Sequence, residues 1–200
     1  EFSDDPRIAM RAVAVVAGLL LLPTLYWLWI ELFGTRRGAL MLVALVALSP
    51  LQVLYSQEAR QYSLWVTLAI AATAALLRAR REAGWRMWAI YALLAVLGLY
   101  THLLFVATLA AHAVWMLLEC CRNNRNMLVR FGISLTAAGA AFLPWCLLLL
   151  SQRGHVRAST EWLRVPVQGG DLVAAWSRQM ARQFVDPPGF RPGIALVATL

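Results

Sequence analysis

Charged residues are scarce in this sequence, and lysine is absent altogether. Charged side chains make up 14% of the 200 residues, and all 18 basic residues are arginine. Soluble domains carry about 25% charged residues, so we do not expect a large soluble core. The arginines lie scattered between apolar runs and form no basic face, which argues against nucleic-acid binding despite a net charge of +8.

Cysteines and cofactor motifs are also few. The three cysteines, Cys120, Cys121 and Cys146, do not have the spacing of paired metal ligands, and we interpret them as small apolar side chains. The sequence contains no P-loop, no GxGxxG, no CxxC pair and no HExxH. Hydride transfer and ATP hydrolysis by this segment are therefore unsupported.

Apolar residues dominate instead, at 61% of the chain with a mean hydropathy of +0.65. A helix needs about 20 apolar residues to cross the hydrocarbon core of a membrane, and six stretches reach or approach that length. These predicted spans cover residues 10–33, 38–56, 62–79, 86–101, 103–119 and 128–150. A seventh run starts near residue 190. We therefore expect an all-α, polytopic transmembrane bundle of six to seven spans.

The chain begins with Glu1 rather than Met and ends inside the apolar run GIALVATL, so we expect a fragment of a longer polytopic protein. Segment 151–189 separates the sixth and seventh spans. Within it, Leu172, Trp176 and Met180 recur every four residues, which predicts an amphipathic helix near 171–184. Whether that helix lies at the membrane interface or packs on a further soluble part stays open.

Arginine counts in the short loops predict the orientation. Loops 34–38, 78–86 and 121–130 hold nine arginines, whereas the loops between them hold only Arg60. The positive-inside rule places the arginine-rich loops in the cytoplasm. The sequence YSQEARQY (55–62), the YTH turn (100–102), the N-terminus and segment 151–189 would then lie outside, on the periplasmic or extracellular side of a bacterial inner membrane.

The gap YSQEARQY does not have the composition of a simple turn. No Gly, Asn or Asp occurs between Pro50 and Gly84, and Gln57, Glu58, Arg60 and Tyr62 together supply hydrogen-bond acceptors, donors and a planar cation. His102 of the YTH turn is expected at the same membrane face, and histidine can act as a metal ligand or a general acid or base. From the residues alone, a solvated turn and a functional site both stay open.

Two strings carry a resemblance to a known family. The sequence LSPLQVLYSQEARQYSL (48–64), followed by LGLYTHLLFV (97–106), resembles the bacterial family-39 glycosyltransferases. These are relatives of the protein O-mannosyltransferases and of the lipid A aminoarabinose transferase, and they share the GT-C fold. The resemblance extends over roughly residues 7–150, and the SQEAR string is its specific part.

The resemblance implies a membrane glycosyltransferase that works without a nucleotide. Such an enzyme takes a sugar from a polyprenyl-phosphate donor on the outer side and transfers it, with inversion, to a lipid, glycan or protein acceptor. The reaction requires a carboxylate to accept the acceptor's proton and a cation to stabilise the departing phosphate. A divalent metal stays open as a cofactor.

The resemblance also implies roles for individual residues. Glu58 would orient a donor, an acceptor or a metal, and Arg60 would pair with it or face the lipid phosphate. Gln57 and Tyr62 would hydrogen-bond around this pair, and His102 and Tyr100 would bind substrate in the same vestibule. Further phosphate-binding candidates in the outer segment are Arg153, Arg157 and Arg164.

One expected element does not match. In that family the main catalytic Asp lies in the first outer loop and is followed by a second acidic residue. Asp4 and Asp5 lie too close to the following helix to correspond to it, so they are not assigned that role. We expect the fragment to lack its principal base and to be inactive alone.

Two other classes of membrane protein stay open. In a transporter or flippase-like protein, Glu58, Arg60 and His102 would serve a proton or substrate pathway, although such charges usually lie near the membrane midplane, often in broken helices. In a non-catalytic assembly subunit, YSQEARQY would be only a hairpin turn.

Overall fold

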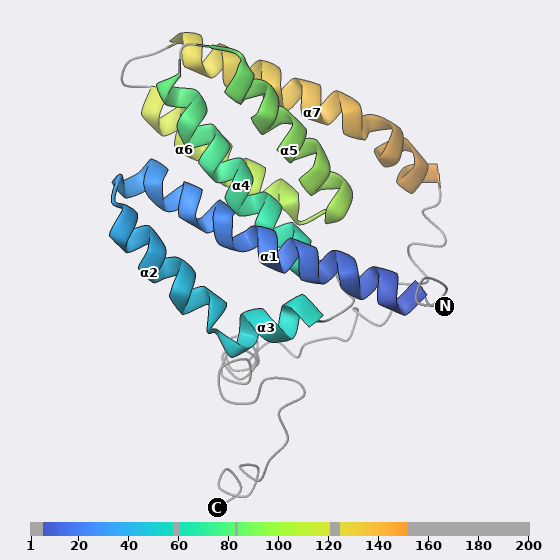
Figure 1. Cartoon of the computed structure of the whole chain (residues 1–200). Coiled ribbons are helices and arrows are strands. Elements are labelled where there is room, and N and C mark those ends of the chain that lie inside the picture. The colour runs from blue at the N-terminus through green and yellow to red at the C-terminus, as the bar shows by residue number, and fades with distance from the viewer. Residues whose placement is uncertain (1–5, 58–60, 83, 121–124, 152–200) are drawn as a thin grey trace, which may run out of the picture. The chain divides into compact units, whose positions relative to one another are not determined.

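The computed structural model describes residues 6–57, 61–82, 84–120 and 125–151, and every regular element among them is an α-helix (Figure 1). This confirms the predicted all-α class for the described part of the chain. The helices are α1 (Pro6–Phe33), α2 (Arg36–Ala47), α3 (Pro50–Gln57), α4 (Tyr62–Arg81), α5 (Arg86–Thr101), α6 (Phe105–Cys120) and α7 (Arg125–Ser151). All but the last residues of α7 belong to one compact unit, Glu1–Leu148. The helix predicted near 171–184 and the run from residue 190 lie outside the described residues.

Three of the described helices are long and apolar enough to cross a membrane: Arg11–Phe33, Tyr62–Arg81 and Arg125–Leu148. The two shorter apolar helices are Arg86–Thr101 and Phe105–Glu119. A 16-residue helix such as α5 is about 24 Å long, against about 30 Å of hydrocarbon. These lengths indicate a membrane protein with three candidate spans in the described residues, fewer than the six predicted there.

The span expected over 38–56 is instead two helices that meet at an angle (Figure 1). α2 stops at Ala47, and the N–H of Ser49 donates to the carbonyl of Val46 at 3.1 Å in a tighter turn. Pro50 then opens α3, because proline lacks an N–H and moves the residue before it out of the helical region. The apolar run continues through the break, which is why hydropathy alone predicts one helix.

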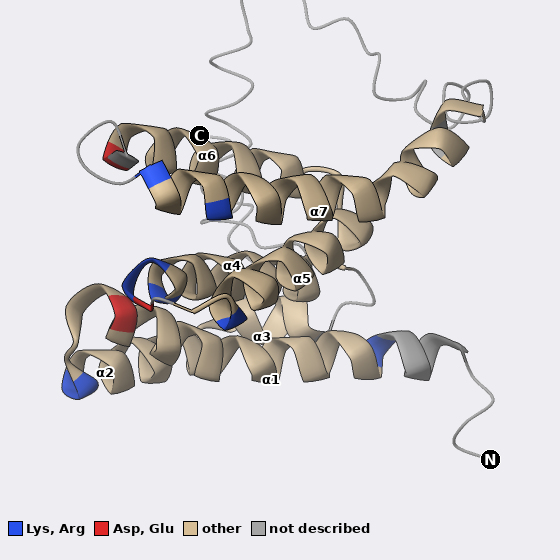
Figure 2. Cartoon of the chain, turned by 90° about the horizontal axis from the view of Figure 1, so that it is seen from above, with Lys and Arg blue, Asp and Glu red and all other residues tan. Residues whose placement is uncertain are grey.

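The helices of the unit lie in three layers, with α1, α2 and α3 on one side, α4 and α5 in the middle, and α6 and α7 on the other (Figures 1 and 2). α1 and α4 pack closely because their facing positions are small, including the buried Ala17 and Ala71. The hydroxyl of Thr67 donates to the carbonyl of Ala17 at 2.9 Å across this contact. α4 thereby becomes the central element on which the other layers pack.

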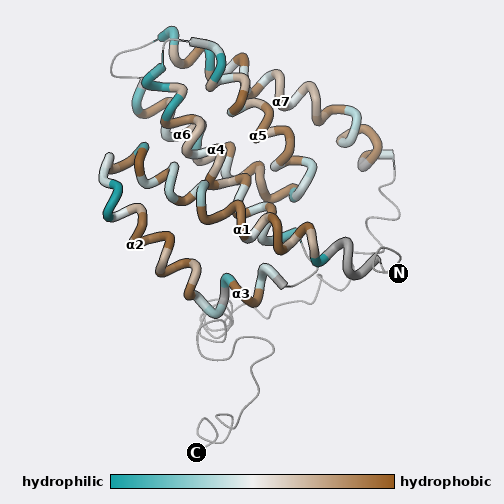
Figure 3. Tube along the Cα trace, in the orientation of Figure 1, coloured by the Kyte–Doolittle hydropathy of each residue, from teal (hydrophilic) through white to brown (hydrophobic). Residues whose placement is uncertain are grey.

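The side-chain core lies between the middle layer and the layer formed by α6 and α7. Trp88 and Tyr91 of α5, Phe105 and Met116 of α6, and Leu76 of α4 are almost fully buried. The tube in Figure 3 is mainly hydrophobic along the middle of the helices and hydrophilic where α2 begins and α4 ends. Many large apolar side chains on the outer faces are exposed, among them Leu19, Leu20 and Leu118, as expected for helices that face lipid.

The described helix ends that flank the three arginine-rich loops lie at one end of this unit, where α1, α4 and α6 end and α2, α5 and α7 begin (Figure 2). We call this the arginine-rich end. Its described arginines are Arg36, Arg37, Arg78, Arg80, Arg81, Arg86, Arg125 and Arg130. The alternation of loops that underlies the predicted orientation is therefore present in the fold, and the end of α3, the start of α4 and the YTH turn lie at the other end.

Candidate functional site

The centre of the predicted site falls between two described helices. Glu58 and Arg60 lie outside the described residues, as does the side chain of Gln57. α3 ends at Gln57, and α4 begins at Tyr62. The structure therefore fixes where this gap begins and ends, and the two helix ends on either side of it can be described.

Contacts between α3 and α4 hold the two sides of the gap close together. The hydroxyl of Ser63 donates to the carbonyl of Tyr55 at 2.7 Å. The rings of Tyr55 and Tyr62 meet edge to face, with their centroids 6.0 Å apart. On its other side, α3 is held against α1 because Gln52 Nε2 donates to the carbonyl of Gly18 at 3.3 Å. Residues 58–60 thus connect two helix ends that are already in contact.

The YTH turn contacts α4 directly after the gap. The imidazole of His102 stacks on the indole of Trp65, with 5.0 Å between ring centroids and 23° between the planes. The backbone N–H of Leu104 donates to His102 Nδ1 at 3.1 Å, so Nδ1 carries no proton here and Nε2 is the protonated ring nitrogen. The structure therefore brings the YTH turn to α4, the helix that follows SQEAR in the sequence.

Tyr100 contacts a different helix from His102. Its hydroxyl donates to the carbonyl of Ala141 in α7 at 2.9 Å, and its ring meets Phe142 edge to face at 5.2 Å. Of the two residues predicted to bind substrate from the YTH turn, His102 lies against α4 and Tyr100 lies against α7. Only His102 is placed next to the SQEAR gap by a contact in the structure.

A buried histidine in α6 was not singled out by the sequence analysis. His112 is 7% exposed, with its Nε2 3.1 Å from Thr73 Oγ1 and its Nδ1 3.2 Å from the hydroxyl of Tyr91. These partners come from α4 and α5, so the three residues connect three helices in the core. The available signal was an ionisable residue inside an apolar run, FVATLAAHAVWMLLEC, which is a candidate functional position in a membrane protein.

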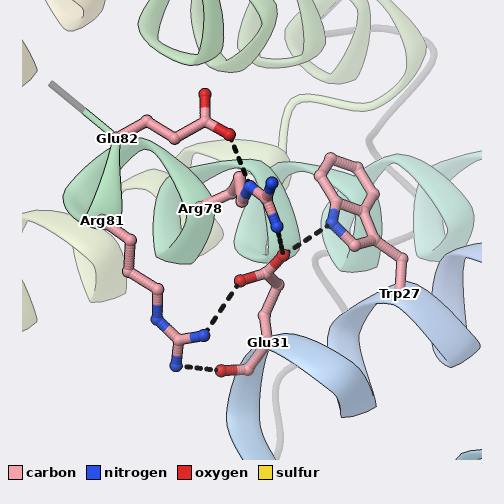
Figure 4. Close-up of polar contacts among 5 residues, drawn as sticks. All are labelled: Trp27, Glu31, Arg78, Arg81 and Glu82. Carbon is pink, nitrogen blue, oxygen red and sulfur yellow. Dashed lines mark hydrogen bonds and ion pairs between the residues drawn. The ribbon is translucent and has the colours of Figure 1, made fainter. Parts of the chain in front are cut away.

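A buried carboxylate near the arginine-rich end was missed as well. Glu31 of α1 is 1% exposed, and Figure 4 shows it surrounded by Trp27, Arg78 and Arg81. Trp27 Nε1 donates to Oε1 at 3.1 Å, Arg78 Nη1 lies 3.3 Å from Oε1, and Arg81 Nη1 lies 3.3 Å from Oε2. Arg81 also donates to the Glu31 carbonyl. This set of contacts fastens the end of α1 to the end of α4, which is a structural role.

A second ion pair at this end joins α4 to α6. Arg80 Nη2 lies 2.8 Å from the carboxylate of Glu119, and the Arg80 guanidinium carbon lies 4.4 Å from the centroid of the Trp115 ring. Carboxylates at the arginine-rich end are thus occupied by arginines from α4. Within the described ranges, no group of three His, Cys, Asp or Glu side chains gathers in a way that could hold a metal ion.

The chain was compared with protein-family models, with curated proteins and with solved structures, and no match was found in any of the three.

Proposed function

We propose that the chain is part of a membrane glycosyltransferase of the GT-C type. It would move a sugar from a polyprenyl-phosphate donor to a lipid, glycan or protein acceptor. The proposal starts from the resemblance of the SQEAR and YTH strings to family-39 glycosyltransferases. The observation that carries it is the stacking of His102 on Trp65, because the YTH turn then lies against the helix that follows the SQEAR string in the sequence.

The proposed chemistry follows from the residue types of the SQEAR and YTH strings. Glu58 orients the acceptor, the donor or a divalent metal, and Arg60 pairs with it or with the donor phosphate. His102 Nε2 offers a hydrogen-bond donor, since Nδ1 is engaged by the N–H of Leu104. The tyrosine pair at the gap supplies further hydroxyl groups, and the apolar faces of the helices hold the lipid tail.

The proposed location is the outer face of a bacterial inner membrane. Its support is that the end of α3, the start of α4 and the YTH turn lie at the ends of these helices opposite the arginine-rich end. The positive-inside bias assigns the arginine-rich end to the cytoplasm. A polyprenyl-phosphate sugar that has already been moved across the membrane would then meet the opposite end.

Replacing one carboxylate tests the proposal. In the full-length protein, reconstituted in vesicles with a polyprenyl-phosphate sugar and its acceptor, we expect Glu58→Gln to lower the rate of sugar transfer about 100-fold, as expected for loss of a group that positions the reactants. Membrane insertion, measured by a protease-protection assay, should not change. The readout is transfer of a radiolabelled sugar.

A matched control is available at the other end of α4. Glu82 is a carboxylate in contact with an arginine, Arg78, at 2.6 Å, but it lies at the arginine-rich end. Glu82→Gln should keep transfer within about twofold, since surface ion pairs contribute about 1 kcal/mol or less. If the Glu58→Gln variant transfers sugar at the rate of the active parent protein, Glu58 has no role in the site.

A second candidate function is a transporter with a proton or substrate pathway. Two observations favour it: His112 lies in the core with hydrogen-bonding partners on α4 and α5, and the α2–α3 segment is a broken helix. Such features are common in transporters. In that case His112→Asn and Glu58→Gln should both lower proton-coupled uptake into vesicles. A glycosyltransferase should instead lose sugar transfer in Glu58→Gln and keep it in His112→Asn.

A further inference from the structure

A pocket of about 260 Å³ lies at the arginine-rich end, far along the helices from the SQEAR gap. Its wall comes from the end of α4, the first turn of α5 and the first turns of α7. The lining residues on which the argument depends are Arg80, Arg81, Glu82, Trp88, Asn126 and Arg130. No residue of the proposed glycosyltransferase site lines it, so this inference does not depend on that proposal.

The charge of the wall selects for an anion. Three arginines line the pocket and one glutamate accompanies them. Glu82 is already paired with Arg78 through a 2.6 Å contact. Two of the lining arginines are paired as well, Arg80 with Glu119 at 2.8 Å and Arg81 with Glu31 at 3.3 Å. Each guanidinium has five N–H donors, so pairing with one carboxylate leaves donors for a second anion. Guanidinium groups bind phosphate and carboxylate oxygens with two parallel hydrogen bonds. The pocket is therefore suited to a small ligand with several negatively charged oxygens.

Hydrogen-bond donors in the wall exceed the acceptors. Arg80 Nε and Trp88 Nε1 are buried and have no acceptor within the part of the chain that the structure describes. Trp88 is 1% exposed, so water does not satisfy its indole from outside. α7 also begins at this pocket, and the first N–H groups of an α-helix have no acceptor within the helix itself. Hydrogen-bond donors without acceptors are thus contributed by α4, α5 and α7.

The size of the pocket limits the ligand to a headgroup. Its 260 Å³ is below the roughly 300–1,000 Å³ of sites that enclose drug-sized molecules. A water molecule takes up about 30 Å³ in the liquid, so there is room for a phosphate group with a short substituent. An extended substrate, such as a nucleotide, would not be enclosed.

The depth of the pocket matches the level of lipid headgroups. It lies where two candidate spans reach their arginine-rich ends, at Arg81 and at Arg125. Trp85, at the start of α5, is 50% exposed beside it and lies 5.3 Å from the guanidinium carbon of Arg130. Exposed tryptophan and arginine are typical of the membrane–water interface, and basic pockets between transmembrane helices bind anionic headgroups.

We propose that this pocket binds a phosphate group, carried by an anionic phospholipid or present as free phosphate. The guanidinium groups of Arg80, Arg81 and Arg130 supply side-chain N–H donors, and the first turn of α7 supplies backbone donors. Binding would join α4, α5 and α7 at the end opposite the SQEAR gap. The bound group would therefore stabilise the packing of α7 on the middle layer.

The experiment uses the purified full-length protein in neutral detergent after delipidation. Phosphatidylglycerol, phosphatidylcholine and inorganic phosphate are titrated separately. Binding is read from thermal unfolding and from lipid adducts in native mass spectrometry. We expect phosphatidylglycerol to bind and to raise the melting temperature, and phosphatidylcholine to do neither. Stabilisation by inorganic phosphate as well identifies the phosphate group itself as the ligand, whereas stabilisation by phosphatidylglycerol alone identifies the lipid headgroup.

Two substitutions with opposite expected effects on lipid binding distinguish a loss of binding from a folding defect. Arg130→Gln should weaken phosphatidylglycerol binding about tenfold, which corresponds to about 1.4 kcal/mol. Glu82→Gln should strengthen it severalfold, a result that a damaged fold would not produce. Arg37→Gln is the matched control, because it removes one exposed arginine from the same end but outside the pocket, and it should change binding less than about twofold.

Two results would overturn the proposal. Both lipids carry a phosphodiester, but the choline group makes the phosphatidylcholine headgroup zwitterionic. Equal binding of phosphatidylglycerol and phosphatidylcholine would therefore mean that the pocket does not select for an anionic headgroup. An equal loss of binding in Arg37→Gln and Arg130→Gln would assign the effect to the general charge of this end rather than to the pocket.

Discussion

The two ends of the described helices hold their polar groups in different ways. At the arginine-rich end, ion pairs connect helices: Glu31 joins α1 to Arg78 and Arg81 of α4, and Arg80 joins α4 to Glu119 of α6. At the opposite end, ring contacts and single hydrogen bonds connect them, such as the stack of Trp65 on His102.

We call the arginine-rich end the fastened end, because ion pairs hold it, and the opposite end, with the SQEAR gap and the YTH turn, the adaptable end. A buried carboxylate with several charge-assisted hydrogen bonds permits few alternative arrangements, because each of them leaves a buried charge unpaired. An exchange of one ring contact for another costs far less. Described side chains near the SQEAR gap can therefore rearrange at lower cost than those at the arginine-rich end, where ion pairs hold the helices in place.

The largest effect is expected at the fastened end. Glu31→Ala removes the acceptor of Trp27, Arg78 and Arg81 at once. Trp27 is left without its acceptor, and the two arginines are about half exposed and recover part of their solvation. We expect a loss of about 3 kcal/mol in the free energy of unfolding, measured by thermal or denaturant unfolding in detergent.

Glu82→Ala is the control for this change. Its carboxylate contacts Arg78, but 35% of its side chain is exposed, so we expect a loss of about 1 kcal/mol or less. Equal losses for the two variants would show that burial of Glu31 adds nothing, and the contrast between the two ends would then disappear.

A steric change at the adaptable end comes next in size. A Cβ on Gly98 would overlap the ring of Phe105, which is fully buried directly after the YTH turn. We expect Gly98→Ala to destabilise the protein by about 1–3 kcal/mol, typical of overpacking, and to displace His102. Hydrogen exchange at residues 98–106 should increase, while exchange near Glu31 should not.

Gly132→Ala provides the comparison, since a Cβ at that α7 position meets nothing within 4 Å. Alanine favours a helix over glycine by up to about 1 kcal/mol, so this variant should be neutral or stabilising. If Gly132→Ala also destabilised the protein, a glycine-to-alanine change would be harmful even without a steric overlap. The effect of Gly98→Ala could then not be attributed to the contact with Phe105.

Much of the fold follows from patterns that depend on local sequence. The helix boundaries at Tyr62, Arg81 and Arg86 lie close to the predicted ends of the apolar runs, because charge and chain reversal coincide there. The break in the second run was not predicted, although Pro50 was its signal, since hydropathy averages over the residues that surround a proline. The short α5 and α6 follow the sequence, but length alone does not make them spans.

Contacts between helices were harder to foresee. Glu31 lies four residues beyond Trp27 in an apolar helix, and its partners Arg78 and Arg81 are 47 and 50 residues away. His112 has the same character, with partners on two other helices. Such pairs require knowledge of which helix faces which, and one sequence does not supply it. The YTH turn was placed beside the gap by topology, because both belong to loops on the same side.

The smallest effect tests the contact on which the proposed function rests. In a double-mutant cycle with Trp65→Leu and His102→Leu, we expect a coupling free energy of about 0.5–1.5 kcal/mol for the stacked rings. The parallel cycle with Trp65→Leu and Tyr100→Phe should give a coupling within about 0.5 kcal/mol of zero, since Tyr100 contacts α7 instead. Equal coupling in both cycles would mean that His102 is no closer to the gap than Tyr100. The two motifs would then share one end of the bundle without sharing a site.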